Sequence, residues 1–161
     1  MDRYLVASGE FKVSAGKKGF LEACLGSCVG LTVCDRKANV GGLLHVLLPE
    51  PVGSDSLWEP DHYATTGVPL FMNALCEAGA KRDRMEACLA GGALVGPVSE
   101  MDLNLDIGGR TLDMVEYVLT WDNIPIKKME TGGFFTCRLS LDLDAWESHI
   151  EPLGMSDSPL I

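Results

Sequence analysis

A predicted β-hairpin over residues 29–48 restricts the fold more than any other segment. Residues 29–35 read Val-Gly-Leu-Thr-Val-Cys-Asp, and this alternation is typical of a strand with two different faces. Polar residues follow at 36–39, and the apolar run 40–48 is typical of a central strand. Pro49 ends this run, because proline has no N–H to donate to a ladder. The two strands are expected to pair antiparallel.

The expected register brings a cysteine and a histidine together. Pairing is expected to begin at the loop, between Asp35 and Val40. This register places His45 opposite Gly30, diagonal to Cys28 and on the same face. Gly30 should leave space for the imidazole to lean toward the sulfur. A slip of one residue would move the two side chains to opposite faces, so the interpretation depends on this register.

Cys28 and His45 are the candidate catalytic pair. A thiol beside an imidazole can pass its proton to the ring and become a thiolate, which attacks carbonyl carbons. Cys28 also follows a Gly-Ser turn, where the backbone N–H groups of Ser27 and Cys28 could bind the oxyanion of a tetrahedral intermediate. Cysteine-based acyl chemistry is therefore the leading hypothesis. The simpler alternative is a buried cysteine near a hydrogen-bonded core histidine.

The remaining cysteines are interpreted as small buried hydrophobic residues; they are Cys24, Cys34, Cys76, Cys88 and Cys137. His62 and His149 are interpreted as surface residues. A zinc site would have to use Cys24, Cys28, Cys34 and His45. It is disfavoured because the chain has no Cys-x-x-Cys motif and alternating strand faces would scatter the ligands. The glycine pairs match no phosphate-binding or dinucleotide motif, so we expect neither a metal nor a cofactor.

The rest of the chain alternates between helical and extended patterns. The expected helices cover about residues 61–78 and 110–121, and the expected strands cover residues 85–90, 124–129 and 134–143, the last being the longest. Residues 145–161 should form a loosely held tail on a single domain that spans residues 1–161. Together the elements predict an α/β layered sandwich with a mixed sheet, because hairpins are antiparallel.

Charge and cysteine content limit the partners and the compartment. The formal net charge of −10 argues against a nucleic acid or an anionic membrane surface as partner and favours a protein. No apolar run approaches the roughly 20 residues of a membrane helix, and the N-terminus lacks the layout of a signal peptide. Six cysteines within mostly apolar segments then indicate a reduced protein. We expect a cytoplasmic protein without direct membrane insertion.

A series of short motifs extends over most of the chain. They are Leu-Gly-Ser-Cys-Val at 25–29, Gly-Gly-x-x-His-x-x-Leu-Pro at 41–49, Tyr63, Ala-Gly-Gly-Ala at 90–93, Ile-Gly-x-Arg at 107–110 and Thr-Gly-Gly at 131–133. In this order and near this spacing, they resemble the chemoreceptor glutamine deamidase family, CheD, of bacterial chemotaxis. The first two motifs are specific in combination, whereas the glycine pairs alone would be weak.

The resemblance implies a fold, an activity and partners. It implies an α/β sandwich with a papain-like cysteine and histidine, which fall on Cys28 and His45. The implied activity converts glutamines in the cytoplasmic region of a chemoreceptor to glutamates, and some members also hydrolyse methyl esters. A CheC-type phosphatase is the implied partner. The family usually has a threonine six residues before the nucleophile, where this chain has Glu22, a carboxylate that could still orient the imidazole.

Two other functions remain open at this point. A CheD-like module could regulate a CheC-type phosphatase or a receptor by binding alone, with the change at Glu22 marking a site that has lost activity. A general cysteine peptidase or acyltransferase would keep Cys28 and His45 and change the substrate.

Overall fold

The computed structural model describes residues 2–16, 18–47, 64–93, 107–131 and 136–153. One sheet has the strand order β1 (Arg3–Leu5), β3 (Phe20–Leu25), β8 (Cys137–Asp142) and β9 (Ser148–Pro152). The other has the order β2 (Phe11–Ala15), β5 (Val40–Val46), β4 (Val29–Asp35), β6 (Glu86–Gly91) and β7 (Ile126–Thr131).

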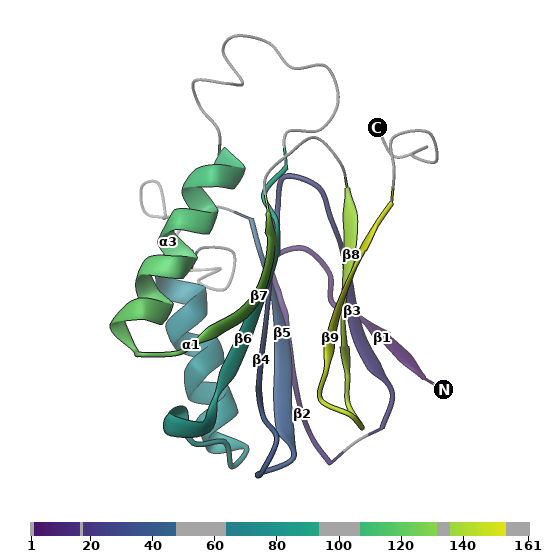
Figure 1. The fold of residues 1–161 in the computed structure, drawn as a ribbon, viewed down its shortest axis with the longest axis vertical. Coiled ribbons are helices and arrows are strands. Elements are labelled where there is room, and N and C mark those ends of the chain that lie inside the picture. Colours follow the sequence, from purple (N-terminus) through teal and green to yellow (C-terminus); the bar gives the residue numbers. More distant parts are fainter. Residues whose placement is uncertain (1, 17, 48–63, 94–106, 132–135, 154–161) are drawn as a thin grey trace, which may run out of the picture.

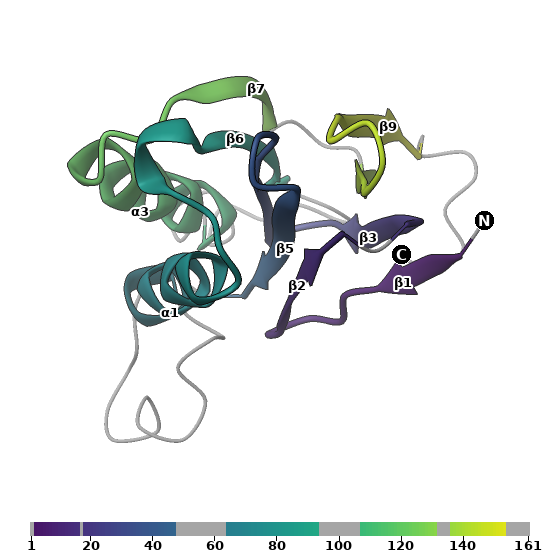
Figure 2. The ribbon, with the colours of Figure 1, turned by 90° about the horizontal axis from the view of Figure 1, so that it is seen from below.

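The sheets and helices form three layers. Helices α1 (Ala64–Glu77) and α3 (Ile107–Trp121) cover one face of the five-stranded sheet, and the four-stranded sheet covers its other face (Figures 1 and 2). A short 3-10 helix, η3 (Arg82–Arg84), precedes β6. Each sheet is mixed, because β1–β3 and β6–β7 are parallel pairs among antiparallel ones. The predicted layered α/β sandwich is confirmed at this level, with two sheets where one was expected.

Both faces of the larger sheet are covered by another layer. Because successive side chains of a strand point to opposite faces, the sheet contributes to two core clusters. The first core cluster fills the space between this sheet and the helices and includes Val29, Leu31, Phe71, Leu75, Val115 and Leu119. The second fills the space between the two sheets and includes Leu21, Ala23, Leu25, Leu43, Leu139 and Leu141. We call this second space the inter-sheet layer.

The predicted hairpin register is confirmed. In the β4–β5 ladder, Asp35 pairs with Val40 and Gly30 pairs with His45. The Asp35 carboxylate is buried and accepts hydrogen bonds from the backbone N–H groups of Ala38 and Lys81, at 3.1 and 2.9 Å. Burial raises the pKa of Asp35, but these bonds and the Arg84 guanidinium outweigh burial and hold the pKa below its ordinary value of 3.8. This end of the hairpin is thereby tied to the segment before β6.

Gly30 has a different role from the expected one. A Cβ at this position would lie 2.7 Å from Leu25 Cδ1 and 2.8 Å from Leu139 Cδ2. Gly30 therefore lets the smaller sheet pack closely on β4. The space above it holds these leucines, which corrects the expectation that it receives the imidazole.

Most expected elements are present, with shifted ends. α1 begins at Ala64 in the described part of the chain, and the expected start at residue 61 lies outside it, as does Tyr63. α3 begins three residues before the expected start, and β7 covers 126–131 instead of 124–129. β8 covers 137–142 and is shorter than β4 and β5, which have seven residues each, so it is not the longest strand. Residues 134 and 135 lie outside the described residues.

The C-terminal region departs most from expectation. Ser148–Pro152 form β9, which pairs antiparallel with β8, so this part of the expected loose tail is held in the smaller sheet. Trp146 is only 4% exposed, and its Nε1 donates to Asn39 Oδ1 at 2.6 Å. Thr32 and Ser148 share a 2.6 Å hydrogen bond between the sheets. These contacts with distant residues, which local pattern does not reveal, order the segment.

Candidate functional site

Cys28 and His45 lie on the same side of the larger sheet. Cys28 packs against the cluster of the inter-sheet layer. His45 pairs with Gly30, whose missing side chain would point at Leu25 and Leu139 of that layer. The structure therefore places Cys28, in the turn before β4, and His45, in β5, on the same face of the larger sheet, as the expected register requires.

The two ring nitrogens of His45 have different surroundings. His45 is 4% exposed, and its Nδ1 lies 3.1 Å from the carbonyl oxygen of Val6. A carbonyl oxygen only accepts, so Nδ1 carries the proton in the neutral ring and donates it to this bond. Nε2 is buried and has no hydrogen-bond partner among the described residues. The nitrogen suited to receive a proton is thus the unpaired one.

The turn that carries Cys28 is braced by the end of β6. The N–H of Gly92 donates to the Cys28 carbonyl at 2.9 Å, and the N–H of Ala93 donates to the Gly26 carbonyl at 3.0 Å. Gly91 has a φ of +97°, and a Cβ there would collide with the Cys28 carbonyl oxygen. The Ala-Gly-Gly-Ala motif at 90–93 therefore supports the cysteine turn.

The predicted oxyanion groups are backbone donors of this same turn. Ser27 is exposed and Cys28 is half-buried. Within the described part of the chain, neither residue's N–H donates to another backbone carbonyl. Binding of a substrate oxyanion requires donors of this kind that are not already bonded.

Burial keeps both side chains of the pair neutral. Burial raises the pKa of the Cys28 thiol above its ordinary value of 9.0, and a hydrogen bond from the Ser8 side chain partly opposes this. Burial also lowers the pKa of His45 below 6.5, against the raising effects of the Val6 carbonyl and the Glu10 carboxylate. Near neutral pH the pair is a thiol and a neutral imidazole. Such a pair suits general-base activation better than a preformed thiolate.

Glu22, the expected third member, is not brought to the imidazole. Its carboxylate forms an ion pair with Arg3, with Nη1 and Oε2 2.7 Å apart. In β3 the alternate residues Leu21 and Ala23 are buried in the inter-sheet layer, so Glu22 points to the opposite face. The group that holds the His45 ring is the backbone carbonyl of Val6.

The segment that surrounds the pair was not predicted from the sequence. Val6 bonds to His45 Nδ1, Ser8 to Cys28, and Gly9 and Glu10 to the His45 backbone. The alternation Phe-Lys-Val-Ser-Ala at 11–15 could have indicated a strand here. It could not have indicated that this strand pairs beside β5.

The other cysteines are free and vary in exposure. Cys34 and Cys88 are buried, Cys76 and Cys137 are half-buried, and Cys24 is exposed, which corrects its interpretation as a buried residue. Burial raises the pKa values of Cys34 and Cys137 to about 11. Among the described residues no group of three or more His, Cys, Asp or Glu side chains could hold a metal ion.

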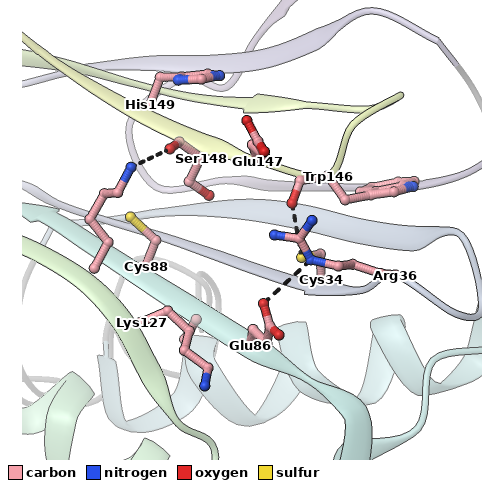
Figure 3. A pocket seen from close by; sticks show the side chains of 11 residues that line it. Cys34, Arg36, Glu86, Cys88, Lys127, Trp146, Glu147, Ser148 and His149 are labelled. Carbon is pink, nitrogen blue, oxygen red and sulfur yellow. Dashed lines mark hydrogen bonds and ion pairs between the residues drawn. The ribbon is translucent and has the colours of Figure 1, made fainter.

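A separate pocket lies at the other end of β4. It has a volume of about 350 Å³ and is lined from β4, β6, β7 and the segment that leads into β9 (Figure 3). Two of its basic side chains are bonded within the protein: Lys128 Nζ to the Ser148 carbonyl at 3.0 Å, and Arg36 Nε to Glu86 Oε2 at 3.5 Å. Cys28 and His45 are not among the residues that line it.

Neither helix in the described part of the chain is long and apolar enough to cross a membrane.

Comparison with known proteins identifies similar chains. The family model described as CheD chemotactic sensory transduction matches residues 47–152. A Desulforamulus reducens protein named "Probable chemoreceptor glutamine deamidase CheD" is 33% identical over 155 residues, which cover 96% of this chain and 92% of that protein. A Pyrococcus abyssi protein of the same name is 36% identical over 138 residues, which cover 86% of this chain and 84% of that protein.

Among solved structures, the Bacillus licheniformis hypothetical protein YfiH aligns with a TM-score of 0.43 and 15% identity. The alignment covers 69% of this chain and 46% of that chain.

Proposed function

The chain belongs to the CheD family, and on that premise we propose that it is a chemoreceptor glutamine deamidase in which Cys28 is the nucleophile and His45 the general base. The observation that carries this proposal is the unpaired Nε2 of His45, on the face of the larger sheet that Cys28 shares. A buried nitrogen without a partner is costly, and a thiol that donates to it would meet that need. The relatives' names supply the substrate class.

The first half-reaction forms a thioester. His45 Nε2 takes the proton of the Cys28 thiol, and the sulfur attacks the side-chain carbonyl carbon of a receptor glutamine. The N–H groups of Ser27 and Cys28 donate to the oxyanion. The carbon–nitrogen bond then breaks, and ammonia leaves with the proton that His45 returns.

The second half-reaction releases glutamate. Water gives a proton to His45 Nε2 as it attacks the thioester carbon, and the carbon–sulfur bond breaks. The proton returns to the sulfur and restores the thiol. The net reaction consumes one water and releases one ammonia for each glutamine. A receptor methyl ester can follow the same steps, with methanol as the leaving group.

The test is mass spectrometry of a chemoreceptor cytoplasmic fragment after incubation with the protein. We expect wild type to change specific glutamines to glutamates and to release equal ammonia. Cys28→Ala and His45→Ala should lose this activity, because each lacks one partner of the proton transfer. Cys24→Ala is the matched control, since Cys24 is an exposed thiol on the outer face of β3 and should be dispensable.

The competing function is a binding module without catalysis. It predicts that the receptor fragment binds but stays unmodified. Conversion that persists in Cys28→Ala would rule out the cysteine mechanism. Two further features, a CheC-type phosphatase as partner and a cytoplasmic location, remain predictions.

A further inference from the structure

Glu10 lies directly across the ladder from His45. Phe11 pairs with Leu44 at the start of the β2–β5 ladder, so the next pair outward is Glu10 and His45. The His45 N–H donates to the Glu10 carbonyl at 3.0 Å, and the Gly9 N–H donates to the His45 carbonyl at 2.9 Å. Two residues thus oppose one, which is a β-bulge. Gly9 occupies the first position of the bulge, and its φ of +79° lies in the left-handed region that glycine adopts readily.

The Glu10 side chain points to the same face as the His45 ring. Phe11 and Leu44 both pack against the cluster under the helices, so the preceding pair faces the inter-sheet layer. The Glu10 carboxylate is near enough for its charge to favour the protonated form of the His45 ring. Glu10 is therefore a close cross-strand neighbour of the imidazole.

Glu10 also closes the turn that holds the ring. Its Oε1 accepts the N–H of Ala7 at 2.8 Å, and its own N–H donates to the Ala7 carbonyl at 3.2 Å. Ala7 follows Val6, whose carbonyl accepts from His45 Nδ1. The Val6 carbonyl and the Ala7 N–H belong to one peptide group, so the Glu10 carboxylate holds the same peptide whose carbonyl orients the imidazole.

Proton transfer from Cys28 leaves a positive charge on His45 in largely apolar surroundings. The residues that the smaller sheet buries in this layer at positions 21, 23, 25 and 139 are all apolar. Among the described residues, the Glu10 carboxylate is the charged group that acts on the His45 ring. The Lys12 Nζ lies 4.0 Å from Glu10 Oε1. The Glu10 side chain is 42% exposed, so solvent weakens its field without removing it.

We infer that Glu10 is the positioning residue of this site: it holds the Val6 turn against His45 and favours the protonated imidazole that forms when Cys28 gives up its proton. The inference rests on the proposed function for its role in turnover. Glu10 thus takes the role of orienting the imidazole, which was considered for Glu22 because of its position six residues before Cys28. Glu10 does not touch the substrate or the reacting atoms.

A histidine titration by NMR tests this without any substrate. The chain has three histidines, and His45→Gln identifies the His45 signal. Glu10→Gln keeps an oxygen to accept the Ala7 N–H but removes the charge, so it should lower the pKa of His45. Glu22→Gln is the matched control, because its carboxylate pairs with Arg3 on the opposite face. An unchanged His45 pKa in Glu10→Gln, or an equal change in Glu22→Gln, would overturn the inference.

Turnover of the receptor fragment then separates the two tasks of Glu10. General acid–base catalysis contributes about 10²–10⁴-fold, and loss of a positioning residue removes part of this. We expect kcat to fall about fivefold in Glu10→Gln and about 30-fold in Glu10→Ala, with KM little changed. Full activity in Glu10→Ala would overturn the positioning role. If wild type shows no turnover, the proposed function fails, while the titration still decides whether Glu10 acts on His45.

Discussion

At the scale of single residues, the reactivity that we propose for His45 depends on its burial and on the carbonyl that binds its Nδ1. The Val6 carbonyl keeps the proton on Nδ1, and burial disfavours the charged ring, so Nε2 carries a lone pair at neutral pH. The Cys28 thiol is kept protonated in the same way. The pair is poised to exchange a proton when a carbonyl substrate arrives, since the thiolate then has an electrophile to attack.

The pH dependence of kcat/KM should reflect these two shifts. Activity needs neutral His45, whose pKa is lowered by burial, so activity should disappear only as pH falls below 6.5. The Cys28 thiol pKa is raised above 9.0, so the alkaline change should lie above that value. The measurement is kcat/KM from acid to alkaline pH. An acid limb centred above 6.5 would contradict a buried His45 base.

The shared face of Cys28 and His45 was predictable because only local information was needed. Strand alternation and a short polar loop determine the register, and the register determines which residues share a face. The partners of His45 were not predictable from such patterns. Val6 and Glu10 lie far from His45 in the sequence, and Glu22 was considered only for its spacing from Cys28, although it points to the opposite face of its strand.

At the scale of elements, the turn before β4 depends on the end of β6. Two hydrogen bonds from Gly92 and Ala93 hold the carbonyls of Cys28 and Gly26, and Gly91 lets the two segments approach. The proposed nucleophile is thus positioned by a strand that lies far along the chain.

Gly91→Ala should damage the site more than the fold. The new Cβ would meet the Cys28 carbonyl, and the positive φ of +97° strains any residue but glycine. We expect the nucleophile turn to shift and kcat to fall about 100-fold, as misplacement of reacting groups by about 1 Å can do. The control is Gly79→Ala, whose Cβ would meet only Val40 Cγ2 at 3.9 Å, and which has a comparable φ of +117°. An equal loss of activity in both variants would contradict this role.

Elements with strong periodicity were predictable, and those that depend on tertiary contacts were not. The helix over 107–121 buries Leu112, Val115 and Leu119 at three- and four-residue spacings, which the sequence shows directly. β9 is short and largely exposed, so its residues carry little pattern of their own. It forms because β8 offers an edge.

At the scale of the whole molecule, Trp146 joins the C-terminal segment to the hairpin. A Cβ on Gly41 would lie 2.6 Å from the Trp146 ring, so the indole fills the space that this glycine leaves open. Its Nε1 bonds to Asn39 in the hairpin loop. The two sheets therefore share the core of the inter-sheet layer, and the proposed catalytic pair lies on the face of the larger sheet that lines it.

Trp146→Ala should destabilise the protein while leaving the chemistry of the site intact. Removal of a buried aromatic side chain costs about 3–5 kcal/mol. Gly41, which lies against the indole, has no side chain of its own that could fill the cavity. Urea unfolding should show this loss in the free energy of unfolding. Iodoacetamide should still modify Cys28 at the wild-type rate in the folded variant. A loss below about 1 kcal/mol would show that the C-terminal segment is not part of the core.

The most direct measurement is acid quenching of the protein during turnover of a glutamine-containing receptor peptide, followed by mass spectrometry of the cysteine-containing fragments. We predict an acyl group on Cys28, with the mass of the peptide less ammonia, and none on Cys24 or Cys34. The central claim that Cys28 is the nucleophile would be contradicted if glutamine is converted to glutamate without this adduct and the Cys28→Ala variant converts it at the same rate.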